Sequence, residues 1–163
     1  MNKLILLLPM LSLGCFAEEN SQTKNYSVGL GMGAMYIGIG ANIALVSKND
    51  FKYFSAGCTA YGSISGAECG FGVGWVTADL FDFETNNHGF GIYAGMLGEE
   101  RYATFKNNQY SFHKNNYYGA GVSYTYFMNG INKSGATFGI SFHATNAEYD
   151  GRYGSFLQLG YQF

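Results

Sequence analysis

The chain has 163 residues, with one Pro, 24 Gly, 14 Phe, 14 Tyr, only 12% charged residues and a formal net charge of -2. This length suits one domain, and the aromatic content excludes a disordered chain, because disordered chains are charged and poor in aromatics. The small net charge excludes a basic surface for nucleic acid, so we expect no nucleic-acid partner. Soluble domains carry about twice this share of charge, which predicts that something other than water faces much of the surface.

The first residues have the pattern of an export signal. A Lys at position 3 precedes an apolar run over residues 4–13, which is followed by a Cys-Phe-Ala ending that signal peptidase accepts. The run is shorter than the roughly 20 residues that span a bilayer. We therefore expect a cleaved signal peptide over 1–17 and an exported mature domain over 18–163, which is soluble in the periplasm, secreted or a β-barrel, with lipidation of Cys15 as an alternative.

Side chains alternate between large apolar and small or polar through most of the mature part. This period of two predicts strands, and Gly at every second position would cost a helix roughly 1 kcal/mol each. We expect eight strands, near residues 25–33, 37–46, 51–61, 67–77, 89–98, 117–127, 135–144 and 154–163.

The two faces of these strands differ consistently. One face of the seventh strand carries Phe138, Ile140 and Phe142, whereas the other carries small or polar residues such as Ser141 and His143. This pattern predicts an all-β fold, a closed eight-stranded antiparallel up-and-down barrel whose outer wall meets lipid. The alternative, a soluble sandwich or lipocalin-like barrel, would point the bulky face inward.

Strand order places the connections at two ends of the barrel. Segments near 34–36, 62–66, 99–116 and 145–153 share one end, and 47–50, 78–88 and 128–134 share the other. With both termini in the periplasm, the first group is extracellular. The longest connection, 99–116, is aromatic and basic and is the candidate site for a surface ligand.

The two cysteines of the mature part, Cys58 and Cys69, flank a predicted turn centred on residues 63–64. That register places Thr59 opposite Glu68 and the two thiols opposite each other, at a separation near that of a disulfide. In the oxidising bacterial envelope we expect a disulfide, with two unpaired thiols as the alternative. We expect no metal site and no cofactor, and we place Glu68 on the inner wall near the outer end.

One short motif suggests chemistry. His143 and Thr145 share a strand face, and Asn146 follows; this run resembles the His-x-Ser-Asn motif of outer-membrane lipid A deacylases, with Thr145 in place of Ser. The resemblance implies His143 as base and Thr145 as nucleophile. A lipid-modifying enzyme is therefore an alternative function, and otherwise we expect no catalytic residues.

The whole mature chain resembles the small outer-membrane barrels of the OmpA/OmpX-like class. The resemblance rests on the signal peptide, the eight amphipathic strands and the ending "LQLGYQF". It implies an outer-membrane location among lipids, a monomer and a non-enzymatic structural or surface-interaction role. It also implies that the barrel-assembly machinery reads the alternating terminal residues, which are Leu157, Leu159, Tyr161 and Phe163.

The final strand is expected to close the barrel against the first, with Phe156, Gln158, Gly160 and Gln162 turned inward. Eight strands leave room for little besides side chains. The aromatic residues expected to fill the interior are Tyr53, Tyr61, Tyr93, Phe127 and Phe156. A narrow channel is a further alternative function.

Overall fold

The computed structural model describes residues 26–62, 66–81, 83–106, 109–149 and 151–163, with the side chain of Tyr61 excepted. The expected signal peptide, Cys15 and the interior position of Tyr61 lie outside the described residues. The elements are β1 (Tyr26–Gly33), η1 (Ala34–Tyr36), β2 (Gly38–Val46), β3 (Asp50–Gly62), β4 (Gly66–Thr77), β5 (His88–Lys106), β6 (Gln109–Phe127), β7 (Gly135–Thr145) and β8 (Tyr153–Gln162).

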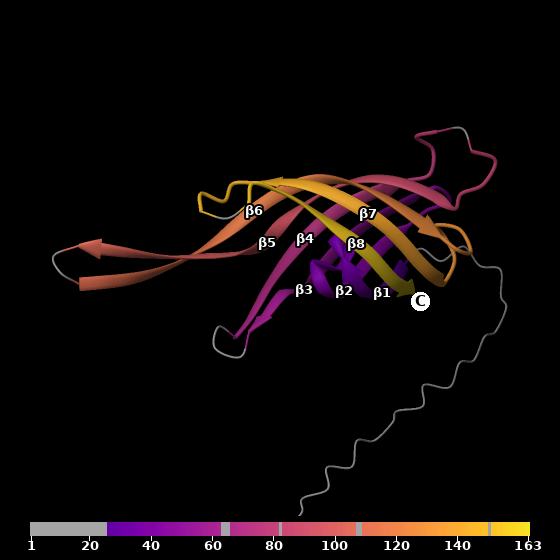
Figure 1. The fold of residues 1–163 in the computed structure, drawn as a ribbon. Helices are drawn as coiled ribbons and strands as arrows, with labels where there is room; N and C mark the ends of the chain where they lie inside the picture. The colour runs from indigo at the N-terminus through magenta and orange to yellow at the C-terminus, as the bar shows by residue number, and fades with distance from the viewer. Residues whose placement is uncertain (1–25, 63–65, 82, 107–108, 150) are drawn as a thin grey trace, which may run out of the picture.

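All eight strands pair with their neighbours in chain order and close into an antiparallel barrel (Figure 1). The closing pair is β1 with β8, in which Leu30 lies opposite Tyr161. The backbone N–H of Phe163 donates to the carbonyl of Val28 at 2.9 Å. The predicted all-β barrel and its closure by the final strand are therefore confirmed. Among the described residues, no helix has the length and apolar character to cross a membrane.

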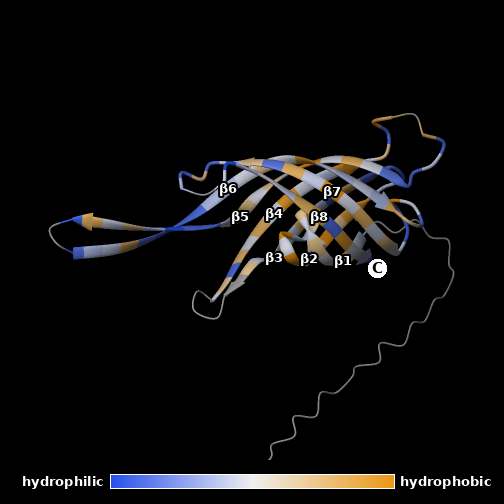
Figure 2. Ribbon diagram, in the orientation of Figure 1, coloured by the Kyte–Doolittle hydropathy of each residue, from blue (hydrophilic) through white to orange (hydrophobic). Residues whose placement is uncertain are grey.

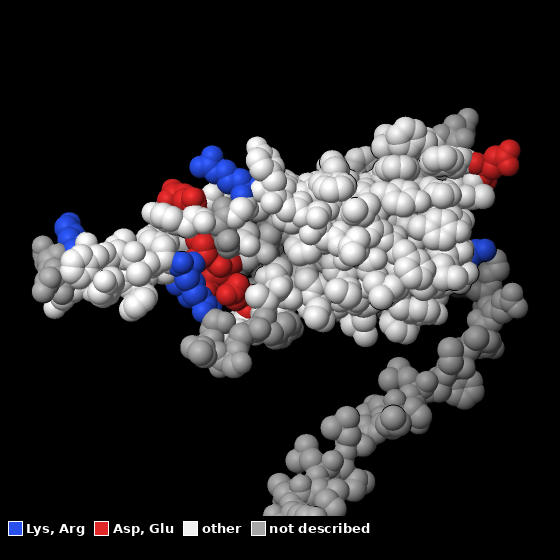
Figure 3. Space-filling model, in the orientation of Figure 1, with Lys and Arg blue, Asp and Glu red and all other residues white. Residues whose placement is uncertain are grey.

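The two walls of the barrel carry opposite kinds of side chain. Outward residues such as Val73 and Phe142 are more than half exposed, whereas the inward Thr125 and Ser141 are fully buried. Hydrophobic residues lie along the barrel strands, and hydrophilic ones gather in the projecting part of β5 and β6 and in connections (Figure 2). On the face shown in Figure 3, charged side chains lie toward the two ends and leave the barrel wall between them uncharged.

The connection between β1 and β2 lies inside the barrel, so its assignment to the surface near 34–36 is wrong. Tyr36 and Ile37 are 0% and 1% exposed, and the Tyr36 hydroxyl bonds with Thr137 at 3.2 Å and accepts from Gln162 Nε2 at 3.1 Å. Ile37, the first residue of the strand expected near 37–46, has a positive φ of 51°, so the strand begins one residue later, at Gly38. The inward fold needs space at Gly160, where a Cβ would overlap the Tyr36 hydroxyl.

Aromatic side chains fill much of the remaining interior. Tyr53, Tyr93 and Phe127 are 5%, 3% and 2% exposed, and Phe51 is fully buried. Phe156 packs against this cluster as a partly buried residue. The predicted filling by Tyr53, Tyr93, Phe127 and Phe156 is confirmed.

The last strand alternates as predicted. Gln158 and Gln162 are buried, while Leu157, Leu159, Tyr161 and Phe163 are exposed on the outer wall. The buried amides have partners inside: Gln158 Nε2 donates to Thr125 at 2.9 Å, and Gln162 Oε1 accepts from Ser27 at 3.0 Å.

Three connections meet at the end of the barrel away from the β3–β4 turn. Asn86 Nδ2 donates to the Lys48 carbonyl at 3.2 Å and to Asn132 Oδ1 at 3.1 Å. Asn49 Nδ2 donates to Asp79 Oδ1 at 2.5 Å. These bonds confirm that the segments 47–50, 78–88 and 128–134 share one end.

Strands β3 and β4 carry the predicted disulfide. Cys58 lies opposite Cys69 in the register, and the two sulfur atoms are bonded. The predicted pairing of Thr59 with Glu68 is wrong, because the register shifts between Cys58 and Ala60 and places Ala60 opposite Glu68. Such a bulge inserts one residue into one strand of a pair. Thr59 instead donates its hydroxyl to the Glu68 carbonyl at 3.4 Å.

Candidate functional site

The candidate site is a two-stranded hairpin that projects from the barrel (Figure 1). The pairing of β5 with β4 ends at Gly95, and the pairing of β6 with β7 begins at Gly119. Between these points β5 and β6 pair only with each other, from Gly98 opposite Tyr117 out to Lys106 opposite Gln109. The segment 99–116, expected to be a loop, is therefore a β-ribbon apart from residues 107–108, which lie outside the described residues.

The hairpin begins at a bulge. The register of β5 against β6 shifts between Met96 and Gly98, and the intervening Leu97 is 2% exposed. A bulge increases local twist and bends the strand. It therefore marks the point where the two strands leave the barrel wall.

The two faces of the hairpin differ. One face carries directly opposed pairs, Ala103 with Phe112 and Phe105 with Tyr110. The rings of Phe105 and Tyr110 are 4.8 Å apart, yet both residues and Phe112 are 59%, 70% and 85% exposed. We call Ala103, Phe105, Tyr110 and Phe112 the aromatic face.

The opposite face is polar. Thr104 Oγ1 and His113 Nε2 are hydrogen-bonded at 2.9 Å, and the His113 ring stacks on Tyr102 at 5.1 Å. Thr104 lies opposite Ser111 in the register. The hairpin is thus amphipathic, although both of its faces lie beyond the barrel.

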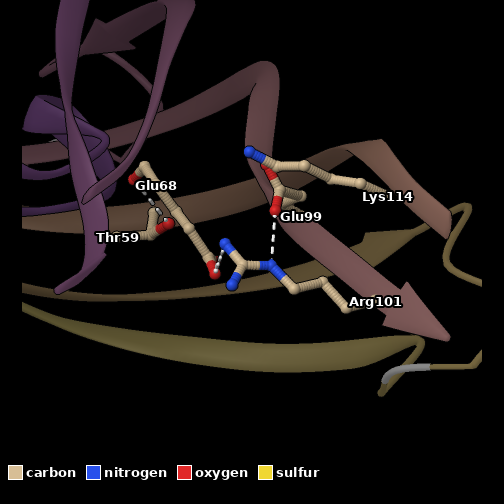
Figure 4. A network of polar contacts seen from close by, with 5 residues as sticks. All are labelled: Thr59, Glu68, Glu99, Arg101 and Lys114. Carbon is tan, nitrogen blue, oxygen red and sulfur yellow. Dashed lines mark hydrogen bonds and ion pairs between the residues drawn. The ribbon is translucent and has the colours of Figure 1, made fainter. Parts of the chain in front are cut away.

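An ion network fixes one face of the hairpin root to β4 (Figure 4). Arg101 lies between two carboxylates, with Nε 2.7 Å from Glu99 Oε1 and Nη2 3.2 Å from Glu68 Oε1. The second oxygen of Glu99 pairs with the Lys114 ammonium on the facing strand. The Glu99 side chain is only 4% exposed. Removing the partners of such a buried charge is costly, because the charge then lacks both water and a counter-ion.

The other face of the root is held by Glu100. Its Oε2 accepts the backbone N–H groups of Glu148 and Tyr149, both at 3.0 Å, and the residue is 6% exposed. The neighbouring Tyr102 ring stacks on Tyr149 at 4.3 Å. The β3–β4 and β7–β8 hairpins therefore clamp the projecting ribbon from both sides, at the end of the barrel where sequence analysis grouped their connections.

The aromatic and basic character of this segment was predictable from its residues, but the ion network was not. Glu68, predicted on the inner wall near the outer end, pairs with Arg101 of β5. Residues 99–105 show no regular alternation of side-chain type, so this segment carried no local signal for a strand. The partner strand brings Lys114 alongside, which no local pattern shows.

The predicted catalytic pair has separate partners. His143 Nδ1 is hydrogen-bonded to the Tyr93 hydroxyl at 3.0 Å, and its ring packs against Phe156 at 5.0 Å. Thr145 Oγ1 donates to the Gly151 carbonyl and accepts from the Ala147 N–H, both at 3.3 Å. The Thr145 hydroxyl thus closes the β7–β8 connection, while His143 belongs to the interior network. Within the described part of the chain, no group of three or more His, Cys, Asp or Glu residues could hold a metal ion.

The fold and the hairpin together define the class of structure as a closed eight-stranded β-barrel with a rooted amphipathic β-ribbon. Comparison of the chain with protein-family models, with curated proteins and with solved structures found no match.

Proposed function

We propose that the protein is a small non-enzymatic β-barrel of the bacterial outer membrane and that its hairpin is a contact surface. The observation that carries this proposal is the apolar outer wall. Every strand exposes at least one large apolar side chain there to between 49% and 58%; examples in strand order are Leu30, Ile43, Phe54, Val73, Ile92, Val122, Phe142 and Leu159. Soluble monomers rarely expose an apolar surface of this extent, and a bilayer removes it from water.

The filled interior supports a structural or surface role over a channel. Tyr36 crosses toward β7 and β8 to bond with Thr137 and Gln162, and Phe51 and Phe127 contact each other with ring centroids 5.7 Å apart. Eight strands leave room for little besides side chains, and the described interior side chains occupy that room, which favours a structural or surface role over a channel. The separate partners of His143 and Thr145 likewise favour the non-enzymatic role over a lipid A deacylase-like one.

The hairpin supplies the contact surface. An isolated two-stranded ribbon is marginally stable in water, and here Glu99 and Glu100 fix the root from its two faces. The ribbon thus holds the aromatic face away from the barrel without burying it. Exposed aromatic residues on a rigid support are typical anchors of protein interfaces, so the proposed partner is a surface ligand outside the cell.

The membrane location is tested by fractionation and by gel mobility. The folded protein should remain in the outer-membrane fraction after a urea wash and should migrate differently on SDS gels before and after boiling. Recovery of a folded chain in the soluble fraction would contradict the proposal.

The contact role is tested by shortening the hairpin. Arg101 and Lys114 lie opposite each other, so an Asn-Gly turn can replace residues 102–113 and leave the ion network in place. Cells with equal amounts of assembled barrel should lose adhesion to a protein-coated surface when they carry this variant. The double variant Phe105→Ser/Phe112→Ser should lose it too, whereas Thr104→Ala/Ser111→Ala on the polar face should keep it. Equal adhesion of all four proteins would refute the contact role.

A further inference from the structure

A groove of about 920 Å³ runs across the outer wall from β1 to β6. One side is a cross-strand row of outward residues, which are Ile43, Phe54, Val73, Ala94 and Ala120. The other side is the next row, which is Tyr26, Leu45, Lys52, Trp75 and Ile92. The register therefore explains the groove as the gap between two adjacent rows.

The floor of the groove is backbone. The residues between the two rows, among them Ala44, Gly74 and Gly121, have side chains that point inward or are absent. Gly74 cannot carry a side chain, because a Cβ there would overlap the ring of Tyr53 from inside the barrel. Ala94 and Ala120 keep the β5 and β6 part of the groove open. The result is a groove across the outer wall whose lining is apolar except for Lys52.

One cation interrupts the apolar lining. Lys52 points outward beside Trp75 and is exposed. The nearest acid on its own strand face is Asp50, whose Oδ1 accepts from the Trp75 indole N–H at 2.7 Å and whose Oδ2 accepts from Ser47 at 3.5 Å. None of the ion pairs among the described residues includes Lys52. Lys52 is thus a cation at the edge of an apolar groove, with no counter-ion among the residues that the structure describes.

We propose that this groove binds an acyl chain of an anionic phospholipid, whose phosphate meets the Lys52 ammonium. The inference rests on the proposed membrane location. Lys52 lies two residues, or about 7 Å along the strand, from the end of β3, so its long side chain reaches the headgroup level from within the apolar wall. Trp75 lies directly opposite Lys52, and Tyr26 belongs to the same cross-strand row; amphipathic rings such as these favour the membrane interface.

The positive charge of Lys52 favours a lipid over a second copy of this chain as the occupant of the groove. A symmetric dimer joined through this groove would place one Lys52 of each copy at the same interface, and the described lining of the groove holds no acid to pair with either lysine. A lipid phosphate supplies the missing negative charge, and a headgroup with net negative charge supplies more than a zwitterionic one. The lining of the groove is therefore apolar, and Lys52 makes the groove favour lipids whose headgroups carry a net negative charge.

The test uses Trp75, the single Trp of the chain. The full chain is folded into phosphatidylcholine vesicles that contain brominated phosphatidylcholine or brominated phosphatidylglycerol, and quenching of Trp75 fluorescence gives the relative binding constant of the two lipids. We expect about fivefold preference for phosphatidylglycerol, the size of effect that one lysine near an anionic surface produces. Lys52→Gln should reduce this preference to about one, and Lys52→Arg should retain it.

Lys48→Gln is the matched control, because Lys48 is an exposed lysine of the nearby β2–β3 turn and does not line the groove. It should keep the fivefold preference. An absent preference in the wild-type protein, or an unchanged one in Lys52→Gln, would overturn the lipid site. Dilution of the protein in lipid separates the copies of a dimer. Weak quenching of Trp75 that becomes stronger on such dilution would therefore overturn the lipid site in favour of a second copy of the chain. Absence of quenching by either brominated lipid would overturn the membrane location itself, so the two proposals fail in different ways.

Discussion

The hydrogen bonds of Tyr36 inside the barrel predict a measurable coupling between β1–β2 and β7. Replacing Tyr36 with Phe removes the hydroxyl that bonds with Thr137 and accepts from Gln162, and keeps the ring. Thr137 and Gln162 are 0% and 2% exposed, so water does not replace the lost partner. A buried polar group left without a partner costs about 1–3 kcal/mol, and we expect Tyr36→Phe to lower the free energy of unfolding by about 2 kcal/mol.

Thr137→Val on its own should cost a similar amount, since it removes the facing hydroxyl at nearly constant volume. The double variant leaves the Thr137 site with no orphaned group, so its loss should be about 2 kcal/mol and not the sum of about 4 kcal/mol. Tyr161→Phe is the control: Tyr161 lies on the outer wall at 43% exposure, and its change should stay within about 0.5 kcal/mol.

The assay is urea unfolding of the wild-type protein and the four variants in the same detergent or lipid. The measured quantity is the fraction of protein that keeps the compact gel mobility. If the loss in the double variant equals the sum of the two single losses to within about 0.5 kcal/mol, the hydroxyls of Tyr36 and Thr137 act independently. That result would refute the assignment of η1 to the barrel interior.

Three further outcomes follow from single contacts. Glu99→Gln should raise the rate of amide hydrogen exchange in the hairpin by about fivefold, as expected for a local loss of about 1 kcal/mol. The exchange rates of the barrel strands should stay unchanged. Equal rates in the hairpins of the variant and the wild-type protein would show that the ion network does not hold the root. Reduction of Cys58–Cys69, which are 11 residues apart, should lower the unfolding free energy by about 2–3 kcal/mol. An unchanged urea midpoint would contradict this. Phe163→Ala removes the terminal ring, so it should reduce the amount of protein assembled in the membrane. It keeps the backbone bond to Val28, so the unfolding midpoint of the assembled protein should stay the same. Equal amounts of assembled variant and wild-type protein would contradict the role of Phe163 as a signal.

The strands and much of their register were predictable because the alternation of side chains repeats along each strand. Pairing Cys58 with Cys69 needed only the turn centre and a count of residues, and the structure has that pair. The same count of residues gave the wrong partner one residue later, at Thr59. The bulge there depends on the local twist of two strands, and the composition of the segment does not indicate it. Local pattern therefore gave the fold but not its irregularities.

The inward fold of η1 was not predictable from its own residues. The segment around Ile37 continues the period of two, so the sequence pattern placed Ile37 on the outer face. Its burial depends on space at Gly160 and on hydroxyl and amide partners at Thr137 and Gln162. These residues are more than 100 positions away in the chain, and only closure of the barrel brings them to Tyr36.

The hairpin was missed for a related reason. Polar residues dominate the segment 99–116, and such composition is typical of a loop. The ribbon forms because Glu68 from β4 and the backbone of Glu148 from the β7–β8 connection bind its two faces. Both partners come from other hairpins, so a local pattern shows the chemistry of the contact surface but not its rigidity.

The strands of the barrel end at different heights. These heights relate the filled interior and the hairpin to the proposed position in the membrane. The pairing of β1 with β8 ends at Met32 opposite Leu159, so the edge of β8 above this level has no β1 partner. Unpaired backbone groups are not tolerated in the hydrocarbon core, which places the upper hydrocarbon boundary of the proposed insertion near Leu159. In the proposed insertion the Glu68–Arg101–Glu99 network lies above this boundary, where charges are tolerated, and β5 and β6 carry the aromatic face farther out. In that insertion the short β1–β2 hairpin sets the depth, and η1 fills the interior where the hairpin ends.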